Sequence, residues 1–392
     1  ESLSAAFATG VREQGINAID IGLASTDMCY FASGHFDFPA AMVTASHNPA
    51  EYNGLKICMN KARPVGEDSG LKEILEIVNT SPERQSVVGN IQEIDVLGEF
   101  ADHVCSVIDV SNLRALKVVA DTANGMGGLI LPPIFKKLPF ELEILFPELD
   151  GNFPNHPADP LRQENQEHLR QRVLETKADI GLAFDGDADR VFLLDEKGES
   201  ISGSLTTALI ADQILREKSD ESVIYNLICS KVVPEVILER GGIGIRSRVG
   251  HSFIKELMEK HDAVFAGEHS GHYYFRENYR ADSGVMASLV VLRALSQYQG
   301  KLSEMLEPFE RYESSGELNF SVMDVRASIE KIEEHYKTSI VDRLDGLTVD
   351  VGDWWFNLRP SNTEPLLRLN IEANNKKVCA QAIEEVRTLL TQ

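Results

Sequence analysis

The sequence predicts an α/β protein with more than one domain. Strand-like apolar segments alternate with helix-period segments over about the first 300 of the 392 residues. Near-continuous apolar strands separated by helices are typical of parallel sheets, in which ligands bind beyond the carboxyl ends of the strands. After about residue 311 the pattern changes to strand-like pieces and a charged helix, which indicates a small α+β domain. A chain of this length is expected to form two to four domains.

The composition is ordinary for a soluble protein, and the charge excludes some classes of partner. Hydrophobic residues make up 43% and charged residues 25% of the chain, and the net charge is -23. Nucleic acids and anionic membranes need a basic surface, so we expect neither as a partner. Five scattered cysteines without CxxC spacing favour reduced thiols. Because no signal peptide or membrane-spanning apolar run is found, we expect a cytoplasmic protein.

The first unit places a serine at the carboxyl end of a predicted strand. Strands are predicted over residues 17–22 and 41–44, and the second leads into the segment TASHNP. Ser46 therefore lies on a tight turn in which Pro49 fixes the backbone. Two interpretations stay open: a nucleophile or phosphoserine, and an ordinary turn or N-cap serine. Its neighbour His47 is equally ambiguous.

The second unit places three aspartates directly after an apolar strand predicted over residues 180–184. In the segment DGDADR, the alternating Asp185, Asp187 and Asp189 offer the hard oxygen ligands that Mg²⁺ prefers. Three like charges after a buried strand are costly without a cation, although a solvated acidic turn remains possible. An EF-hand is rejected because Arg190 stands where that loop needs glycine and because the flanking segments read as strands. Arg190 would supply a fixed cation for a transferring phosphoryl group.

The third unit leads a strand predicted over residues 263–266 into the glycine-flanked segment GEHSGH. Glu268, Ser270 and His272 alternate in this segment, so their donor and acceptor groups could bracket a pair of sugar hydroxyls. A plain polar loop is an equally good interpretation.

The C-terminal region contains the segment RPSNTEP, which is a second ligand-binding candidate. Arg359, Ser361, Asn362 and Thr363 offer a guanidinium, hydroxyls and backbone N–H groups, which suit a phosphate monoester. A plain turn fits the composition nearly as well. Lys56 and His251 are weaker candidates, because a lone lysine or histidine is usually structural or solvated.

Taken together, the four segments resemble the α-D-phosphohexomutase superfamily, specifically its phosphomannomutase/phosphoglucomutase branch. TASHNP, DGDADR, GEHSGH and RPSNTEP occur in the order in which that family carries its phosphoserine, metal, sugar and phosphate loops. The segment DGNFPNH from Asp150 onward also matches, so the resemblance spans essentially the whole chain. It implies three similar mixed or parallel α/β domains plus a smaller C-terminal α+β domain around a central cleft. We expect these domains at residues 1–96, 97–198, 199–311 and 312–392.

The resemblance also implies a mechanism, that of an isomerase acting on hexose phosphates. Phosphorylated Ser46 would donate its phosphoryl group to a hexose 1- or 6-phosphate, and the bound hexose 1,6-bisphosphate would turn around and return the other phosphate. The residues expected in catalysis are Ser46, His47, Lys56, Arg190, His251 and His272. Those expected to bind substrate are Glu268, Ser270, His272, Arg359, Ser361, Asn362 and Thr363. Those expected to hold Mg²⁺ are Ser46, Asp185, Asp187 and Asp189. Which of Lys56, His251 and His272 is acid or base is left open.

The substrate is open between mannose and glucose phosphates. GEHSGH looks like the loop of the mannose/glucose phosphomutases, whereas phosphoglucosamine mutases usually carry Gln where this chain has His269. We expect mannose phosphates as the main substrate and keep glucose phosphate as the alternative. The sequence does not indicate an oligomeric state.

Two departures from the family pattern favour a further alternative. The chain starts at Glu1, without the strand region containing glycine and arginine with which the family's first domain begins, so we expect that domain to be N-terminally incomplete. Ile228 stands where relatives often have a basic residue. A non-catalytic sugar-phosphate-binding protein therefore remains an alternative, as does a simple metal-dependent phosphatase.

Overall fold

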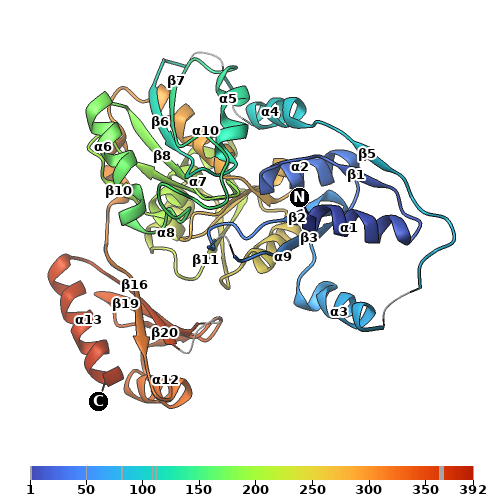
Figure 1. Ribbon diagram of the computed structural model, residues 1–392. Helices are drawn as coiled ribbons and strands as arrows, with labels where there is room; N and C mark the ends of the chain where they lie inside the picture. The colour runs from blue at the N-terminus through green and yellow to red at the C-terminus, as the bar shows by residue number, and fades with distance from the viewer. Residues whose placement is uncertain are drawn as a thin grey trace.

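The structure is a computed structural model that describes residues 2–49, 51–80, 83–107, 109–110, 113–361 and 366–391. Within these residues the strands form one two-stranded, one three-stranded and three five-stranded sheets, which follow one another along the chain as four units (Figure 1). No helix in the described part of the chain is both long and apolar enough to cross a membrane.

The first unit contains two small sheets and the turn that carries Ser46. β1 (Ala18–Asp20) pairs in parallel with β5 (Ile91–Glu93). β2 (Ala40–Val43), β3 (Leu55–Met59) and β4 (Arg63–Pro64) form the second sheet. The helices of this unit are α1 (Ser2–Glu13), α2 (Thr26–Phe36) and α3 (Leu71–Thr80).

The parallel arrangement expected for the strand before Ser46 is wrong. β2 pairs antiparallel with β3, with Val43 opposite Leu55. The chain returns from one strand to the next without a helical crossover, and so short a connection permits only antiparallel pairing.

The second unit is a five-stranded sheet in the order β10-β9-β8-β6-β7. Its strands are β6 (Lys117–Asp121), β7 (Glu141–Leu145), β8 (Ile180–Phe184), β9 (Val191–Leu194) and β10 (Ser200–Ile201), and its helices are α4 (Leu97–Ser106), α5 (Gly127–Phe135) and α6 (Glu167–Thr176). β6, β7 and β8 are parallel, whereas β9 runs antiparallel to β8. The aspartates lie in the connection between β8 and β9, so the strand predicted to precede them and the strand predicted to follow them are both confirmed.

The third unit is a five-stranded sheet in the order β12-β11-β13-β14-β15. Its strands are β11 (Ser222–Asn226), β12 (Ile243–Ser247), β13 (Phe265–Gly267), β14 (Tyr273–Phe275) and β15 (Ala281–Asp282), and its helices are α7 (Gly203–Glu217), α8 (Val232–Glu239), α9 (His251–His261), α10 (Gly284–Gln297) and α11 (Leu302–Leu306). β11, β12 and β13 are parallel. The segment GEHSGH, residues 267–272, connects β13 to β14 and is called the sugar-loop candidate below.

The fourth unit is an antiparallel sheet in the order β16-β20-β19-β18-β17 with two helices. Its elements are β16 (Glu313–Ser321), α12 (Val325–His335), β17 (Ile340–Asp342), β18 (Leu347–Asp350), β19 (Trp354–Pro360), β20 (Leu366–Ala373) and α13 (Lys376–Thr391). Short 3₁₀ helices lie elsewhere in the chain at η1 (Asn60–Ala62), η2 (Glu67–Ser69), η3 (Gln163–Gln166), η4 (Arg276–Asn278) and η5 (Glu307–Phe309).

The hydrophobic cores separate the fourth unit from the other three. One cluster of buried side chains joins the first three units and includes Phe31, Phe184 and Phe265. A second cluster lies wholly within the fourth unit and includes Phe356 and Leu369. In Figure 1 the fourth unit, in orange and red, accordingly lies apart from the rest. The expected fold class, α/β units followed by a smaller C-terminal α+β unit, is confirmed.

Candidate active site

The backbone at Ser46 is held in an unusual conformation against the aspartate loop. Ser46 has a φ of 51°, in the left-handed region that non-glycine residues rarely adopt, which costs about 1–3 kcal/mol and is concentrated at functional sites. Its N–H donates to Thr44 Oγ1 at 2.9 Å. A Cβ on Gly186 would lie 2.5 Å from the Ser46 carbonyl oxygen. Only glycine therefore lets the two loops approach so closely.

The Ser46 hydroxyl lies between a carboxylate, a guanidinium and an imidazole. Its Oγ donates to Asp185 Oδ2 at 2.6 Å and lies 3.4 Å from Arg190 Nη2. His47 Nδ1 is 3.3 Å from the same oxygen and accepts a hydrogen bond from Arg190. Burial and the Arg190 charge lower the pKa of His47 to about 4, so its imidazole is neutral near pH 7. Arg190 is itself buried and donates from Nε to Asp185 Oδ2 at 2.9 Å.

The three aspartates form a compact group of buried oxygen atoms. One carboxylate oxygen from each of Asp185, Asp187 and Asp189 lies within 4.8 Å of the others. Asp187 Oδ1 and Asp189 Oδ1 are buried and have no hydrogen-bond partner among the described residues. Buried, unpartnered carboxylate oxygens at this spacing fit a hard divalent cation such as Mg²⁺.

Lys56 also contacts this group, from β3. Its Nζ lies 3.0 Å from Asp187 Oδ2 and 2.5 Å from Asp189 Oδ2. Burial alone would raise the pKa of Asp187, but the Lys56 ammonium and hydrogen bonds from hydroxyl groups hold it below its usual value. Burial raises the pKa of Asp185 to about 7 despite the opposing charge of Arg190. The fold therefore brings Lys56 together with Ser46 and the aspartates.

The sugar-loop candidate is joined to the aspartate loop through the backbone. Arg190 and His272 form an isolated antiparallel bridge, and the N–H of Val191 donates to the Gly271 carbonyl at 3.3 Å. Glu268 is buried and accepts from Ser270 Oγ through Oε2 at 3.0 Å. Within the described part of the chain its Oε1 has no hydrogen-bond partner, and burial raises the pKa of the Glu268 carboxyl.

The two histidine candidates for proton transfer differ in their surroundings. His272 Nδ1 lies 2.9 Å from Asp282 Oδ2 and 3.7 Å from Asp189 Oδ1. Burial would lower the pKa of His272, but these two carboxylates raise it above its usual value. His251 begins α9, and burial together with the Lys255 charge lowers its pKa to about 4. Lys255 is buried and pairs with Asp282 Oδ1 at 3.0 Å.

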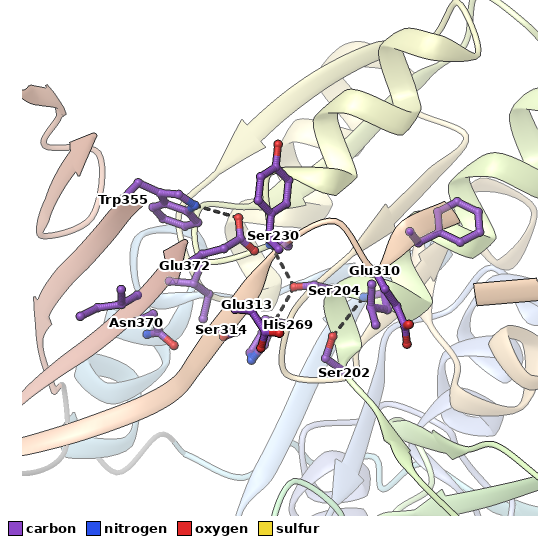
Figure 2. Close-up of a pocket in the computed structure, with 15 residues that line it drawn as sticks. Ser202, Ser204, Ser230, His269, Glu310, Glu313, Ser314, Trp355, Asn370 and Glu372 are labelled. Atoms are coloured by element: carbon purple, nitrogen blue, oxygen red, sulfur yellow. Dashed lines mark hydrogen bonds between the residues drawn. The ribbon is translucent and has the colours of Figure 1, made fainter. Parts of the chain in front are cut away.

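A cavity of about 410 Å³ separates the sugar loop from the fourth unit (Figure 2). His269 reaches toward it, with Nδ1 2.9 Å from Ser204 Oγ. The Ser204 hydroxyl accepts the N–H of Ser230 at 3.1 Å, so its own hydrogen is free for His269 Nδ1. Burial lowers the pKa of His269. Ile228 lines the same cavity.

The described part of the phosphate-loop candidate, residues 359–361, lies in the fourth unit. Arg359 is buried and pairs with Glu317 on β16 at 3.3 Å, and among the described residues its Nε has no hydrogen-bond partner. The N–H of Ser361 donates to the Leu366 carbonyl at 2.9 Å. Asn362 and Thr363 lie outside the described residues.

The fourth unit is held against the third by polar contacts. Lys231 Nζ pairs with Asp350 at 2.7 Å, and the Lys231 N–H donates to Glu372 at 2.9 Å. Trp355 Nε1 donates to the same Glu372 oxygen at 2.8 Å, as drawn in Figure 2. These contacts attach the fourth unit to the third.

The sequence reasoning missed several residues that contact the predicted site. Thr26 Oγ1 and Thr44 Oγ1 donate to Asp187 Oδ2 at 2.6 and 2.9 Å. Asp282 contacts His272, and Lys255 pairs with Asp282. Thr44 lies inside the TASHNP segment, so the sequence indicated that it lies near Ser46. The others carry no signal in the sequence, because their importance depends on which loops and helix ends meet.

Comparison with known proteins gives a consistent family along the whole chain. Models of the phosphoglucomutase/phosphomannomutase family match in order: α/β/α domain I at residues 1–85, domain II at 98–198, domain III at 202–312 and the C-terminal domain at 317–389. A protein of Methanocaldococcus jannaschii named phosphomannomutase is 38% identical over 98% of this chain and 86% of its own length.

A bacterial relative and a solved structure agree with these matches. The Escherichia coli K12 protein named phosphomannomutase is 37% identical over 100% of this chain and 88% of its own length. The crystal structure of a phosphoglucomutase/phosphomannomutase family protein from Burkholderia thailandensis has a TM-score of 0.89 at 30% identity and covers 99% of this chain and 85% of that one. The resemblance inferred from the four segments is thereby confirmed. The chain belongs to the phosphoglucomutase/phosphomannomutase family of isomerases.

Proposed function

We propose that this chain interconverts hexose 6-phosphate and hexose 1-phosphate, with mannose as the main sugar, through a phosphoserine at Ser46 and a bound hexose 1,6-bisphosphate. The observation that carries the proposal is the position of the Ser46 hydroxyl, 2.6 Å from Asp185 and 3.4 Å from Arg190 on a strained turn. A phosphoryl group on this oxygen would lie beside a fixed guanidinium and a group of metal-type ligands. The names of the M. jannaschii and E. coli relatives favour mannose over glucose.

The surrounding cations would stabilise the transferring phosphoryl group. Arg190 and Lys56 are held in place by carboxylates, so little reorganisation is needed when charge develops on the phosphoryl oxygens. Mg²⁺ would be held by Asp185, Asp187, Asp189 and a phosphoserine oxygen, and when bound it supplies further positive charge at the same place. This list of ligands rests on the unpartnered oxygens of Asp187 and Asp189.

Proton transfer needs a group that removes the hydrogen of the attacking sugar hydroxyl and returns one to the leaving oxygen. His272, Lys56 and His251 are the titratable candidates around Ser46 and the sugar loop. Their pKa values differ: that of His251 is about 4, whereas those of His272 and Lys56 are raised by neighbouring carboxylates. Near pH 7 the His251 imidazole is therefore neutral and the Lys56 ammonium charged, so Lys56 is suited to hold a phosphate.

Sugar recognition is assigned to Glu268 and Ser270, and phosphate recognition to the loop after β19. The unpartnered, buried Oε1 of Glu268 can accept a hydrogen bond from a sugar hydroxyl. Arg359 and Ser361, with Asn362 and Thr363, would hold whichever phosphate is not reacting. Arg359 would then exchange its Glu317 partner for phosphate oxygens.

The remaining features of the proposal concern organisation and location. The domains are proposed at residues 1–96, 97–198, 199–311 and 312–392. The partners are proposed to be small hexose phosphates in the cytoplasm, without nucleic acid.

A coupled assay tests this function. Wild-type protein with Mg²⁺ and a hexose 1,6-bisphosphate is given mannose, glucose and glucosamine phosphates side by side, with Ser46→Ala as the control. We expect isomerisation of mannose phosphate at the highest kcat/KM and none by the control. Binding of sugar phosphates without turnover would point to a non-catalytic relative. Steady release of inorganic phosphate would point to a phosphatase.

A further inference from the structure

A buried carboxylate joins the first turns of two helices from different units. Asp27 is 0% exposed and accepts the N–H of Met28 at 2.9 Å. It also accepts hydrogen bonds from the hydroxyl groups of Ser25, the N-cap of α2, and Ser283, the N-cap of α10. The distance from Ser283 Oγ to Asp27 Oδ2 is 2.6 Å. Each serine oxygen accepts a backbone N–H of its own helix, so its hydrogen is free for Asp27.

The helix α2 fixes the middle carboxylate of the metal-site candidate. The N–H of Thr26 donates to the Asp187 carbonyl at 3.0 Å, and its hydroxyl donates to Asp187 Oδ2 at 2.6 Å. Thr44 and Lys56 contact the same Oδ2. Asp187 Oδ1 is left buried, and no described residue forms a hydrogen bond with it. These contacts hold the Asp187 carboxylate in one rotamer with Oδ1 available to a cation.

The helix α10 touches the same loop at its own N-terminus. A Cβ on Gly284 would lie 2.8 Å from the Arg190 carbonyl carbon and 3.1 Å from the Ala188 carbonyl oxygen, so glycine is needed for this approach. Asp282, two residues earlier, holds His272 at 2.9 Å. The loop that carries the aspartates therefore contacts the first turns of both helices, and Asp27 is the group that connects the two.

A charge buried at this junction is unfavourable for stability taken alone. Burial raises the pKa of Asp27 to about 7, although the serine hydroxyls and the Met28 N–H oppose the shift. A buried polar group is often no more stabilising than an apolar one of similar volume. The Asp27 carboxylate accepts hydrogen bonds from the N-cap serines of both helices, which an apolar side chain cannot do. It therefore fixes the two N-caps relative to each other.

We infer that Thr26 and Asp27 are positioning residues for the reaction: Thr26 orients the metal-ligand candidate Asp187, and Asp27 fixes α2 against α10 so that the aspartate loop and His272 keep their relative positions. The inference rests on the proposed function. Neither residue needs to touch the substrate, since both act through Asp187, Ser283 and their neighbours.

The test compares metal binding and kinetics in matched variants. Mn²⁺ binding, measured by electron paramagnetic resonance without substrate, reports on the loop directly. The variants are Thr26→Val, which removes the hydroxyl, Thr26→Ser, which keeps it, and Asp27→Asn. The control is Asp212→Asn, which also removes a buried carboxylate, but one whose partners Arg216 and Arg240 do not contact the aspartate loop.

We expect Thr26→Val and Asp27→Asn to weaken Mn²⁺ binding about tenfold or more and to lower kcat, because partners behind metal ligands typically contribute 10–100-fold to affinity or activity. KM for the sugar phosphate should change less than kcat, because neither residue is proposed to touch the substrate. Thr26→Ser and Asp212→Asn should bind Mn²⁺ like the wild type.

Equal Mn²⁺ affinity in Thr26→Val and Thr26→Ser would overturn the role of Thr26, and equal affinity and kcat in Asp27→Asn and Asp212→Asn would overturn that of Asp27. If Asp27→Asn does not fold, Ser283→Ala replaces it, because it removes the hydroxyl that donates to Asp27, together with the acceptor for the Met286 N–H. If the wild type binds Mn²⁺ but isomerises no hexose phosphate, the proposed function fails while the Mn²⁺ comparison still decides the inference.

Discussion

We predict that Lys56→Met binds a divalent cation more tightly than the wild type while losing mutase activity. The Lys56 ammonium lies 3.0 Å from Asp187 Oδ2 and 2.5 Å from Asp189 Oδ2, so it neutralises the carboxylates that a metal would use. Methionine has a similar length and no charge. Removing the ammonium leaves the negative charge of both carboxylates uncompensated, so they attract the metal more strongly, but it also removes a cation proposed to act on the phosphoryl group.

The expected change in Mn²⁺ affinity follows from the contacts of Lys56 with Asp187 and Asp189. A hydrogen bond to a charged group contributes about 1.5–3 kcal/mol. Because 28% of the Lys56 side chain is exposed, water compensates part of this free energy when the bond is lost. We therefore take about 1.5 kcal/mol, the lower end for one such bond. At about 1.4 kcal/mol for each factor of ten, Mn²⁺ should bind about tenfold more tightly to the variant.

The assay is a Mn²⁺ titration of metal-free protein followed by electron paramagnetic resonance, with kcat measured on the same preparations. Lys231→Met is the matched control, since Lys231 is 33% exposed and pairs with Asp350 in the fourth unit. It should leave Mn²⁺ affinity unchanged. An unchanged or weaker Mn²⁺ affinity in Lys56→Met would refute the idea that the ammonium neutralises the charge that attracts the metal.

Three further predictions follow from the site and its surroundings. Ser46→Ala should fold but lose mutase activity by orders of magnitude in the presence of the bisphosphate, and near wild-type turnover would remove the phosphoserine assignment. Asp187→Asn should weaken Mg²⁺ dependence and activity together, whereas an unchanged metal titration would exclude Asp187 as a ligand. Although burial lowers the pKa of His156, Asp121 raises it overall, so this ion pair stabilises the fold fully below about pH 6.5 and less as pH rises through the raised pKa. His156→Gln should therefore lose stability chiefly at the lower pH in chemical denaturation, and an equal loss at all pH values would contradict this.

The sequence was sufficient for the parts of the site that lie on continuous segments. The aspartates follow β8, and the residues of GEHSGH follow β13, because a buried apolar strand must end where charged residues begin. β8 and β13 belong to different sheets, so these two loops meet because the second and third units pack together, with a bridge between Arg190 and His272. Ser46 lies after a strand as expected, even though that strand belongs to an antiparallel sheet.

The sequence could not supply contacts made between helix ends and between strand faces. Thr26 and Ser283 read as ordinary helix starts, and nothing in either segment indicates that one carboxylate joins them. Arg359 has the expected chemistry for phosphate, but its pairing with Glu317 depends on the order β16-β20-β19 in the fourth sheet. Such partners are far apart in sequence, so only the assembled fold identifies them.

The central claim is that Ser46 carries the phosphoryl group, and mass spectrometry tests it most directly. Wild-type protein and Ser46→Ala are incubated with Mg²⁺ and a hexose 1,6-bisphosphate, and their intact masses and phosphopeptides are measured. We expect one added phosphoryl group on Ser46 in the wild type, its loss when a hexose 6-phosphate is added in excess, and no modification in the variant. Isomerisation by a wild-type sample whose Ser46 stays unmodified throughout would contradict the account.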